Sequence, residues 1–186
     1  MVCIFFAISV MIPIFVLKKE CNFKKKINMQ LSKNFKLEEF VTSTTATKYG
    51  IDNTPNAVQL ENLTNLCVDC LQPVRDEYGK PIIINSGFRT AALNAAMEKD
   101  GFRVSKTSQH MLGEAADIRD ADKKQNKVLF DLILKQGVFD QLIWEDGNSK
   151  YPDWIHVSYR KNRKQVLRML NGATTHSKYD LTKWNK

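Results

Sequence analysis

The sequence predicts a single α+β domain in which helices pack on a small, mainly antiparallel sheet. Its 186 residues are enough for one domain with a real core, and a hydrophobic share of 43% is ordinary for a globular protein. Short runs rich in β-branched residues alternate with segments of helical spacing, and a hairpin signal joins two of the runs. The sequence has no internal repeat. The alternation of strand-like and helix-like segments favours helices layered on a sheet.

Residues 1–30 form a segment apart from the predicted domain. Val2 to Leu17 are almost wholly apolar, and five lysines follow them. The apolar run is near the lower limit for a membrane span and has the length of a signal-peptide core, but no basic region precedes it. The lysines after it would keep the following domain in the cytoplasm. A membrane anchor, a translation start at Met29 and a cleaved signal all stay open, and a membrane contact is expected only if the segment is real.

The first half of the domain, which we place at 31–160, reads as mainly helical. A short helix is expected around Leu37–Phe40, followed by a threonine-rich loop over 43–49. A longer helix should begin with Thr54 as its N-cap, run to residue 78 and be bent or broken late by Pro73. Helical spacing indicates that its apolar face belongs to the core.

This helix carries a Cys-x-x-Cys pair at Cys67 and Cys70. The pair would suit a redox centre or half of a zinc site, but no second pair accompanies it. Spacing of three on a helix also places both thiols on the buried face, where free cysteine packs as a small apolar side chain. We expect the packing role.

The second half of the domain reads as strands with two helices between them. A helix over Ala121–Gln136 should turn Val128 and Leu129 inward. In the strand over Asp153–Tyr159, alternation should place His156 on the face opposite its direct neighbours. The predicted order is a strand over 80–85, a helix over 91–97 capped by Thr90, a loop over 100–107, a strand over 115–118, the helix over 121–136, a strand over 139–145, a turn over 146–149 and the strand over 153–159.

Two of the three histidines lie in dense, punctuated stretches that suggest a metal site. His110 and Asp117 are seven residues apart around Gly113, and His156 follows far downstream. Neutral imidazoles and a carboxylate are ligands that Zn²⁺ prefers, and a catalytic zinc keeps three protein ligands with one open position. These three residues could form a zinc site on the sheet, between a loop and a strand. For a lone His-Asp pair, however, the favoured interpretation is a core histidine and an aspartate paired with arginine.

Two further residues could complete such a site. Asp153 precedes His156 by three residues, so its carboxylate could take a proton from water beside the metal. Arg89 lies at a predicted strand-to-helix junction, where its planar guanidinium suits a carboxylate or a developing oxyanion. An internal salt bridge is the alternative for Arg89.

The ordered motifs resemble a known family. Ser-x-His-x-x-Gly-x-Ala-x-Asp at 108–117, Trp-x-His at 154–156 and Ser-Gly-Phe-Arg-Thr at 86–90 are similar to the zinc D-alanyl-D-alanine carboxypeptidases and L-alanyl-D-glutamate endopeptidases that cut peptidoglycan. This family includes phage endolysins. The resemblance covers roughly residues 31–160, while the polar loop over 100–107 departs from the shorter, glycine-rich family pattern, which leaves substrate choice open.

The resemblance implies an enzyme that hydrolyses peptide bonds in peptidoglycan stem peptides with one zinc ion per chain. It implies a monomer that stays in the cytoplasm until lysis, or an anchored or exported enzyme if residues 2–17 are translated and inserted. A non-catalytic wall-binding module with a structural zinc is the alternative. The implied roles are His110, Asp117 and His156 as metal ligands, Asp153 as general base and Arg89 as oxyanion stabiliser. We further expect Arg89, Ser108 and Trp154 to contact substrate. Trp144 and Trp154 could line the site, or both could be ordinary core aromatics.

Charge is concentrated at the two ends of the chain. Residues 1–30 carry a net +4, residues 31–159 carry −3 and residues 160–186 carry +7, within a total of +8. This separation disfavours one organised nucleic-acid-binding patch, so we expect no specific nucleic-acid partner. The basic segment over 161–186 could bind an anionic wall polymer, or it could be a solvated tail or helix face.

Overall fold

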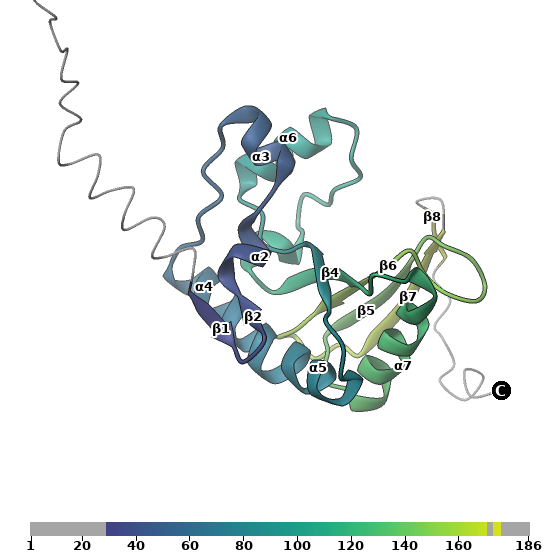
Figure 1. Ribbon diagram of the computed structural model, residues 1–186. Helices are drawn as coiled ribbons and strands as arrows, with labels where there is room; N and C mark the ends of the chain where they lie inside the picture. Colours follow the sequence, from purple (N-terminus) through teal and green to yellow (C-terminus); the bar gives the residue numbers. More distant parts are fainter. Residues whose placement is uncertain (1–28, 171–172, 176–186) are drawn as a thin grey trace, which may run out of the picture.

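The computed structural model describes residues 29–170 and 173–175 and shows an α+β fold (Figure 1). A six-stranded sheet has the order β3-β4-β6-β5-β7-β8. All of its neighbouring pairs are antiparallel except β5 and β7, so the predicted mainly antiparallel sheet is confirmed. The sheet strands are β3 (Ile83–Ser86), β4 (Ala115–Arg119), β5 (Gln141–Glu145), β6 (Trp154–Ser158), β7 (Gln165–Leu170) and β8 (Ala173–Thr175).

The N-terminal part forms a small hairpin and two short helices. Strands β1 (Gln30–Ser32) and β2 (Phe35–Lys36) pair antiparallel, and α2 (Leu37–Val41) follows as predicted. The loop expected over 43–49 is wrong, because α3 (Thr44–Tyr49) occupies it. The side chain of Ser43 accepts a hydrogen bond from the N–H of Ala46, and this cap outweighs the low helix propensity of threonine.

The predicted long helix is a continuous helical segment in three parts. These are α4 (Ala57–Asn65), the π-helical stretch η1 (Leu66–Leu71) and α5 (Gln72–Tyr78). The N-cap is Asn56 and not Thr54, because the Asn56 side chain and Gln59 form a reciprocal capping box. Pro73 lies in the first turn of α5, directly after the π-helical stretch, so the wider turn accommodates it without ending the segment.

The remaining helices connect successive strands along the chain, from β3 to β4 and from β4 to β5. Helix α6 (Ala91–Lys99) is capped by Thr90 as predicted. Helix α7 begins at residue 126, five residues later than expected, because a 3₁₀ turn precedes it. The elements are α6 (Ala91–Lys99), the 3₁₀ turns η2 (Gln109–Leu112) and η3 (Lys123–Gln125), and α7 (Asn126–Gln136).

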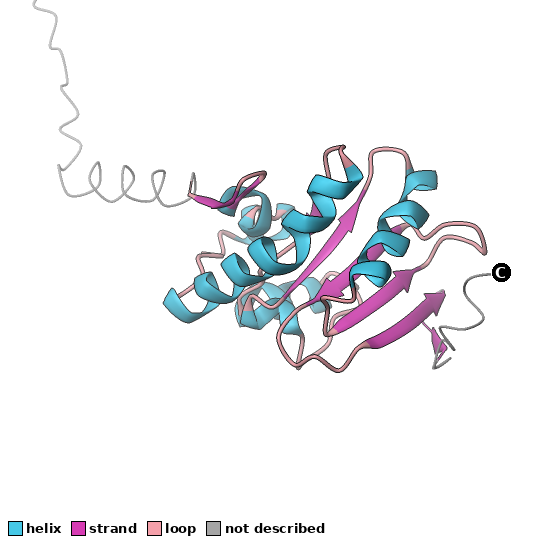
Figure 2. Ribbon diagram, turned by 90° about the horizontal axis from the view of Figure 1, so that it is seen from below, coloured by secondary structure: helices cyan, strands magenta, loops and turns pink. Residues whose placement is uncertain are grey.

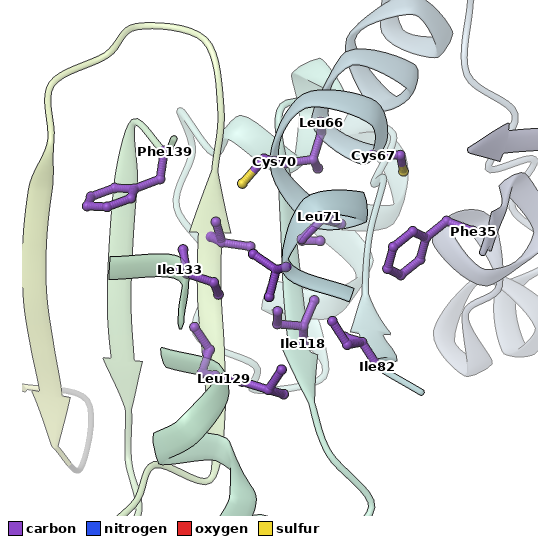
Figure 3. Close-up of a cluster of buried hydrophobic side chains, with 14 of the residues drawn as sticks. Phe35, Leu66, Cys67, Cys70, Leu71, Ile82, Ile118, Leu129, Ile133 and Phe139 are labelled. Carbon is purple, nitrogen blue, oxygen red and sulfur yellow. The ribbon is translucent and has the colours of Figure 1, made fainter. Parts of the chain in front are cut away.

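The core lies between one face of the sheet and the helices that cover it. Figure 2 shows the α4–α5 segment and α7 lying across this face. In Figure 3, Leu71 of the helical segment and Leu129 of α7 approach Ile118 of β4, and all three side chains are fully buried. Cys67 and Cys70 are buried free thiols in the same core, as expected. Val128 was expected to point inward but is 44% exposed, because the buried face of α7 is set by Leu129, Phe130 and Ile133.

Strand β7 lies within the basic segment that the charge pattern set apart. It pairs with β5 in parallel, with Val166 opposite Leu142 and Leu167 opposite Ile143. Val166 and Leu167 are both buried, so this part of the basic segment is a strand of the sheet and not a tail or helix face. The apolar stretch over 2–17 lies outside the described residues, and the part of the chain that is described holds no helix long and apolar enough to cross a membrane.

Candidate metal centre

Three of the predicted site residues come together on the face of the sheet away from α5 and α7. The nearest ligand atoms of His110, Asp117 and His156 all lie within 4.8 Å of one another. Nε2 of His110 is 3.2 Å from Nδ1 of His156. Oδ1 of Asp117 is 3.3 Å from Nε2 of His110 and 2.9 Å from Nδ1 of His156. Two nitrogens and one oxygen therefore form a compact triangle.

Asp117 and His156 are held together by the register of two neighbouring strands. Strands β4 and β6 are neighbours in the sheet (Figure 1). Asp117 on β4 is directly opposite His156 on β6, so their side chains project from the same face. Ile155 and Val157 alternate with His156 and are fully buried in the core on the other face. The alternation predicted along this strand therefore places His156 in the site.

His110 reaches the site from the short turn η2. Its Nδ1 is 2.6 Å from the carbonyl oxygen of Gly87, which accepts a hydrogen bond from the Nδ1–H tautomer and leaves Nε2 facing the triangle. The imidazole is only 2% exposed, and burial lowers its pKa below the ordinary value. In this tautomer Nε2 of His110 presents a lone pair to the triangle, as a metal ligand must.

Two glycines of the predicted motifs are required by close backbone contacts. A Cβ atom on Gly87 would lie 2.6 Å from the backbone of Phe40 in α2. A Cβ atom on Gly113 would lie 2.4 Å from the carbonyl oxygen of Gln59 in α4, and the φ angle of Gly113 is +73°. Through these contacts, the loop that bears Arg89 packs closely on α2, and the loop that bears His110 packs closely on α4.

The triangle has the dimensions and donor chemistry of a zinc site. Ligands 2.0–2.1 Å from a tetrahedral zinc lie about 3.3 Å apart, close to the separations between these three atoms. Burial favours the neutral form of Asp117, but His110 and His156 outweigh it and hold its pKa well below the usual range. An ionised Asp117 and the Nδ1–H tautomer of His110 suit zinc binding, and the triangle can hold one metal ion.

Arg89 lies at the edge of this centre with an unsatisfied group. Arg89 lies shortly after β3 in the sequence and is only 8% exposed. Its backbone N–H donates to the carbonyl oxygen of His110 at 3.2 Å. Nε is buried without a hydrogen-bond partner. Burial lowers the pKa of Arg89, while the charges of Asp117 and Glu145 oppose this shift. A buried donor without a partner next to two carboxylates is suited to bind a substrate oxygen.

Glu145 is a carboxylate near the site that sequence reasoning missed. It is the last residue of β5 and pairs with Trp154, two positions before His156. Burial, and then the charge of Asp117, raises the pKa of Glu145 to about 7. Alternation along β5 places Glu145 on the same face as Ile143, but only the pairing of Ile143 with His156 on β6 brings that face to the site.

The other predicted site residues make their side-chain contacts outside the triangle. Oδ1 of Asp153 is 3.0 Å from Nζ of Lys123 on η3, and the Asp153 side chain is 34% exposed. Ser108 caps η2, where its Oγ accepts a hydrogen bond from the N–H of His110. Trp154 lies on the face of His156, whereas Trp144 is buried in the core against Phe130. Of the two tryptophans, Trp154 is the one that adjoins the site.

Comparison with known proteins agrees with this geometry. A family model described as Peptidase M15 matches residues 33–158, which include every residue of the triangle. No curated protein matches the chain. The matched region runs from the N-terminal hairpin to the end of β6.

Proposed function

Because the chain belongs to the peptidase M15 family of zinc metallopeptidases, we propose that it hydrolyses peptide bonds in the stem peptides of peptidoglycan. The observation that carries this proposal is the His110–Asp117–His156 triangle, which presents two nitrogens and one oxygen at tetrahedral spacing. A bound zinc ion supplies Lewis-acid activation of water and of the scissile carbonyl.

Arg89 is the proposed group that stabilises the oxyanion of the transition state. Arg89 donates to the carbonyl oxygen of the scissile bond as it becomes an oxyanion, because its Nε is buried and has no partner. Its guanidinium stays charged, since burial lowers a pKa whose ordinary value is far above neutral and two carboxylates counteract the shift. The donor is therefore positioned before substrate binds.

Asp153 is the proposed general base. It accepts a proton from the attacking water and passes it to the leaving amine. Its position three residues before His156 supports this role, but its carboxylate must exchange Lys123 for the water. The pair is solvent-accessible, with Lys123 at 55% and Asp153 at 34% exposure, so this exchange costs only about 0–1 kcal/mol.

Glu145 is a second candidate for the proton transfer. A carboxyl group with a pKa of about 7 has the acidity that general acid–base catalysis favours at neutral pH. Its strand position places it near Trp154 on the face of the metal centre. The two carboxylates are distinguished by substituting each one separately.

The test of the proposed function is hydrolysis of purified peptidoglycan with and without chelator, with product masses identified by mass spectrometry. We expect soluble peptides or a released terminal amino acid with zinc, and none after chelation. The masses identify the bond and so distinguish a carboxypeptidase from an endopeptidase. Binding to peptidoglycan without any zinc-dependent product would instead support the wall-binding module.

A further inference from the structure

A buried carboxylate links the C-terminal segment to the metal centre. Asp140 lies just before β5 and its side chain is 0% exposed. Nε of Arg163 donates to Oδ1 of Asp140 at 3.0 Å, and Nη2 donates to Oδ2 at 2.7 Å. The backbone N–H of Arg163 donates to Oδ1 at 2.8 Å. This bidentate contact satisfies a charge whose burial would otherwise be costly.

Gln109 extends the contact to the turn that carries His110. Its Nε2 donates to Oδ2 of Asp140 at 3.0 Å, and its Oε1 accepts from Nη2 of Arg163 at 2.9 Å. Nε2 also lies 3.2 Å from Oε2 of Glu114, whose backbone N–H donates to the carbonyl of Gln109 at 3.0 Å. The network therefore binds both ends of the segment 109–114, with His110 inside it.

Asp140 is itself fixed to the sheet. Its N–H donates to the carbonyl of Ser158 at the end of β6 at 2.7 Å, and its carbonyl accepts from Gln165 at the start of β7 at 3.0 Å. The backbone of Asp140 is therefore bonded to strands β6 and β7, whereas Gln109 belongs to the turn η2. Arg163 bridges the two, because its guanidinium contacts both side chains.

We propose that Arg163 is a positioning residue: with Asp140 and Gln109 it holds the turn of His110 at the correct distance from the strands of Asp117 and His156. This inference rests on the proposed zinc function. It gives one basic residue of the C-terminal segment a role inside the fold. One proposed ligand comes from the turn and two come from the strands, and zinc tolerates only a narrow range of ligand distances.

The test measures zinc affinity by competition with a chelator, under conditions where each variant is folded. Arg163→Ala should weaken zinc binding by roughly tenfold or more, as for other groups that orient metal ligands. Arg163→Lys should restore part of the affinity, because an ammonium neutralises Asp140 but lacks the planar fork. The absorption spectrum of the cobalt-substituted protein should shift in Arg163→Ala, reporting altered ligand geometry.

Two further variants separate positioning from general stability. Gln109→Ala leaves the pair of Asp140 and Arg163 intact but disconnects it from the turn, so it should also weaken zinc binding. Lys135→Ala removes an exposed 2.8 Å pair with Glu77 and should leave zinc affinity unchanged. If Arg163→Ala does not fold, Gln109→Ala decides the question.

Affinity within twofold of the wild type in Gln109→Ala, and in Arg163→Ala if it folds, would overturn the inference even if unfolding temperatures fall. Such a result would show that the network stabilises the fold without setting the ligand geometry. A wild-type protein that binds no zinc would instead overturn the proposed function. The two failures are therefore distinguishable in one set of measurements.

Discussion

Replacing Asp153 with asparagine should abolish most turnover while leaving the fold and the metal in place. The backbone N–H of Asp153 donates to Glu145 at 2.9 Å and its carbonyl accepts from Asn126 at 2.9 Å, and both bonds survive the substitution. The lost ion pair with Lys123 is solvent-accessible and contributes about 0–1 kcal/mol. Removal of a general base costs about 10²–10⁴ in rate, or roughly 3–5 kcal/mol of activation free energy.

The assay combines product formation from purified peptidoglycan, zinc content per chain and thermal unfolding. Lys123→Met is the matched control, because it removes the same ion pair but keeps the carboxylate. It should reproduce the small stability change of Asp153→Asn with near-normal turnover. Normal turnover in Asp153→Asn together with a large loss in Glu145→Gln would refute the assignment and make Glu145 the base. Loss of zinc in Asp153→Asn would show that Asp153 is a ligand.

Three further predictions concern Arg89, residues 1–28 and Glu145. Arg89→Lys keeps the charge but loses the planar fork, so turnover should fall at least tenfold with zinc content unchanged; unchanged turnover in the peptidoglycan assay contradicts the oxyanion role. A chain that begins at Met29 should fold, bind zinc and be fully active, and insolubility or metal loss in this shorter chain would show that residues 1–28 belong to the fold. In the zinc-free protein the pKa of Glu145 is raised from 4.5 to about 7, so stability falls as pH rises through this interval. Thermal unfolding should therefore show that Glu145→Gln gains more stability at about pH 8 than at about pH 4, and an equal gain at both refutes the shift.

The sequence was sufficient for the parts of the site that depend on local pattern. Strand alternation placed His156 on the face opposite Ile155, and the motif around Gly113 placed His110 in a loop before β4. Zinc was predicted from the resemblance of three ordered motifs to a zinc peptidase family, because the donor types alone also suit a core histidine and a paired aspartate.

Features that depend on contacts between distant segments could not be read in this way. Glu145 enters the site only through its pairing with β6, and its pKa depends on burial. Glycine is required at position 87 because the backbone of Phe40, 47 positions earlier in the sequence, leaves no room for a Cβ atom. The helix α3 was missed because a single serine cap outweighed the composition of its six residues. In α3 a capping contact overrode the local propensity, whereas the roles of Glu145 and Gly87 depend on tertiary contacts.

The strand order also determines when the centre can exist during synthesis. A nascent chain that has emerged only as far as β5 already contains His110 and Asp117, but β6, which lies between β4 and β5 in the sheet and carries His156, is still missing. Arg163 and β7 emerge later still. Since a ribosome produces the chain from its N-terminus, the third ligand and its support arrive last. Tight zinc binding, and with it any hydrolytic activity, is therefore postponed until translation has passed the family-matched region.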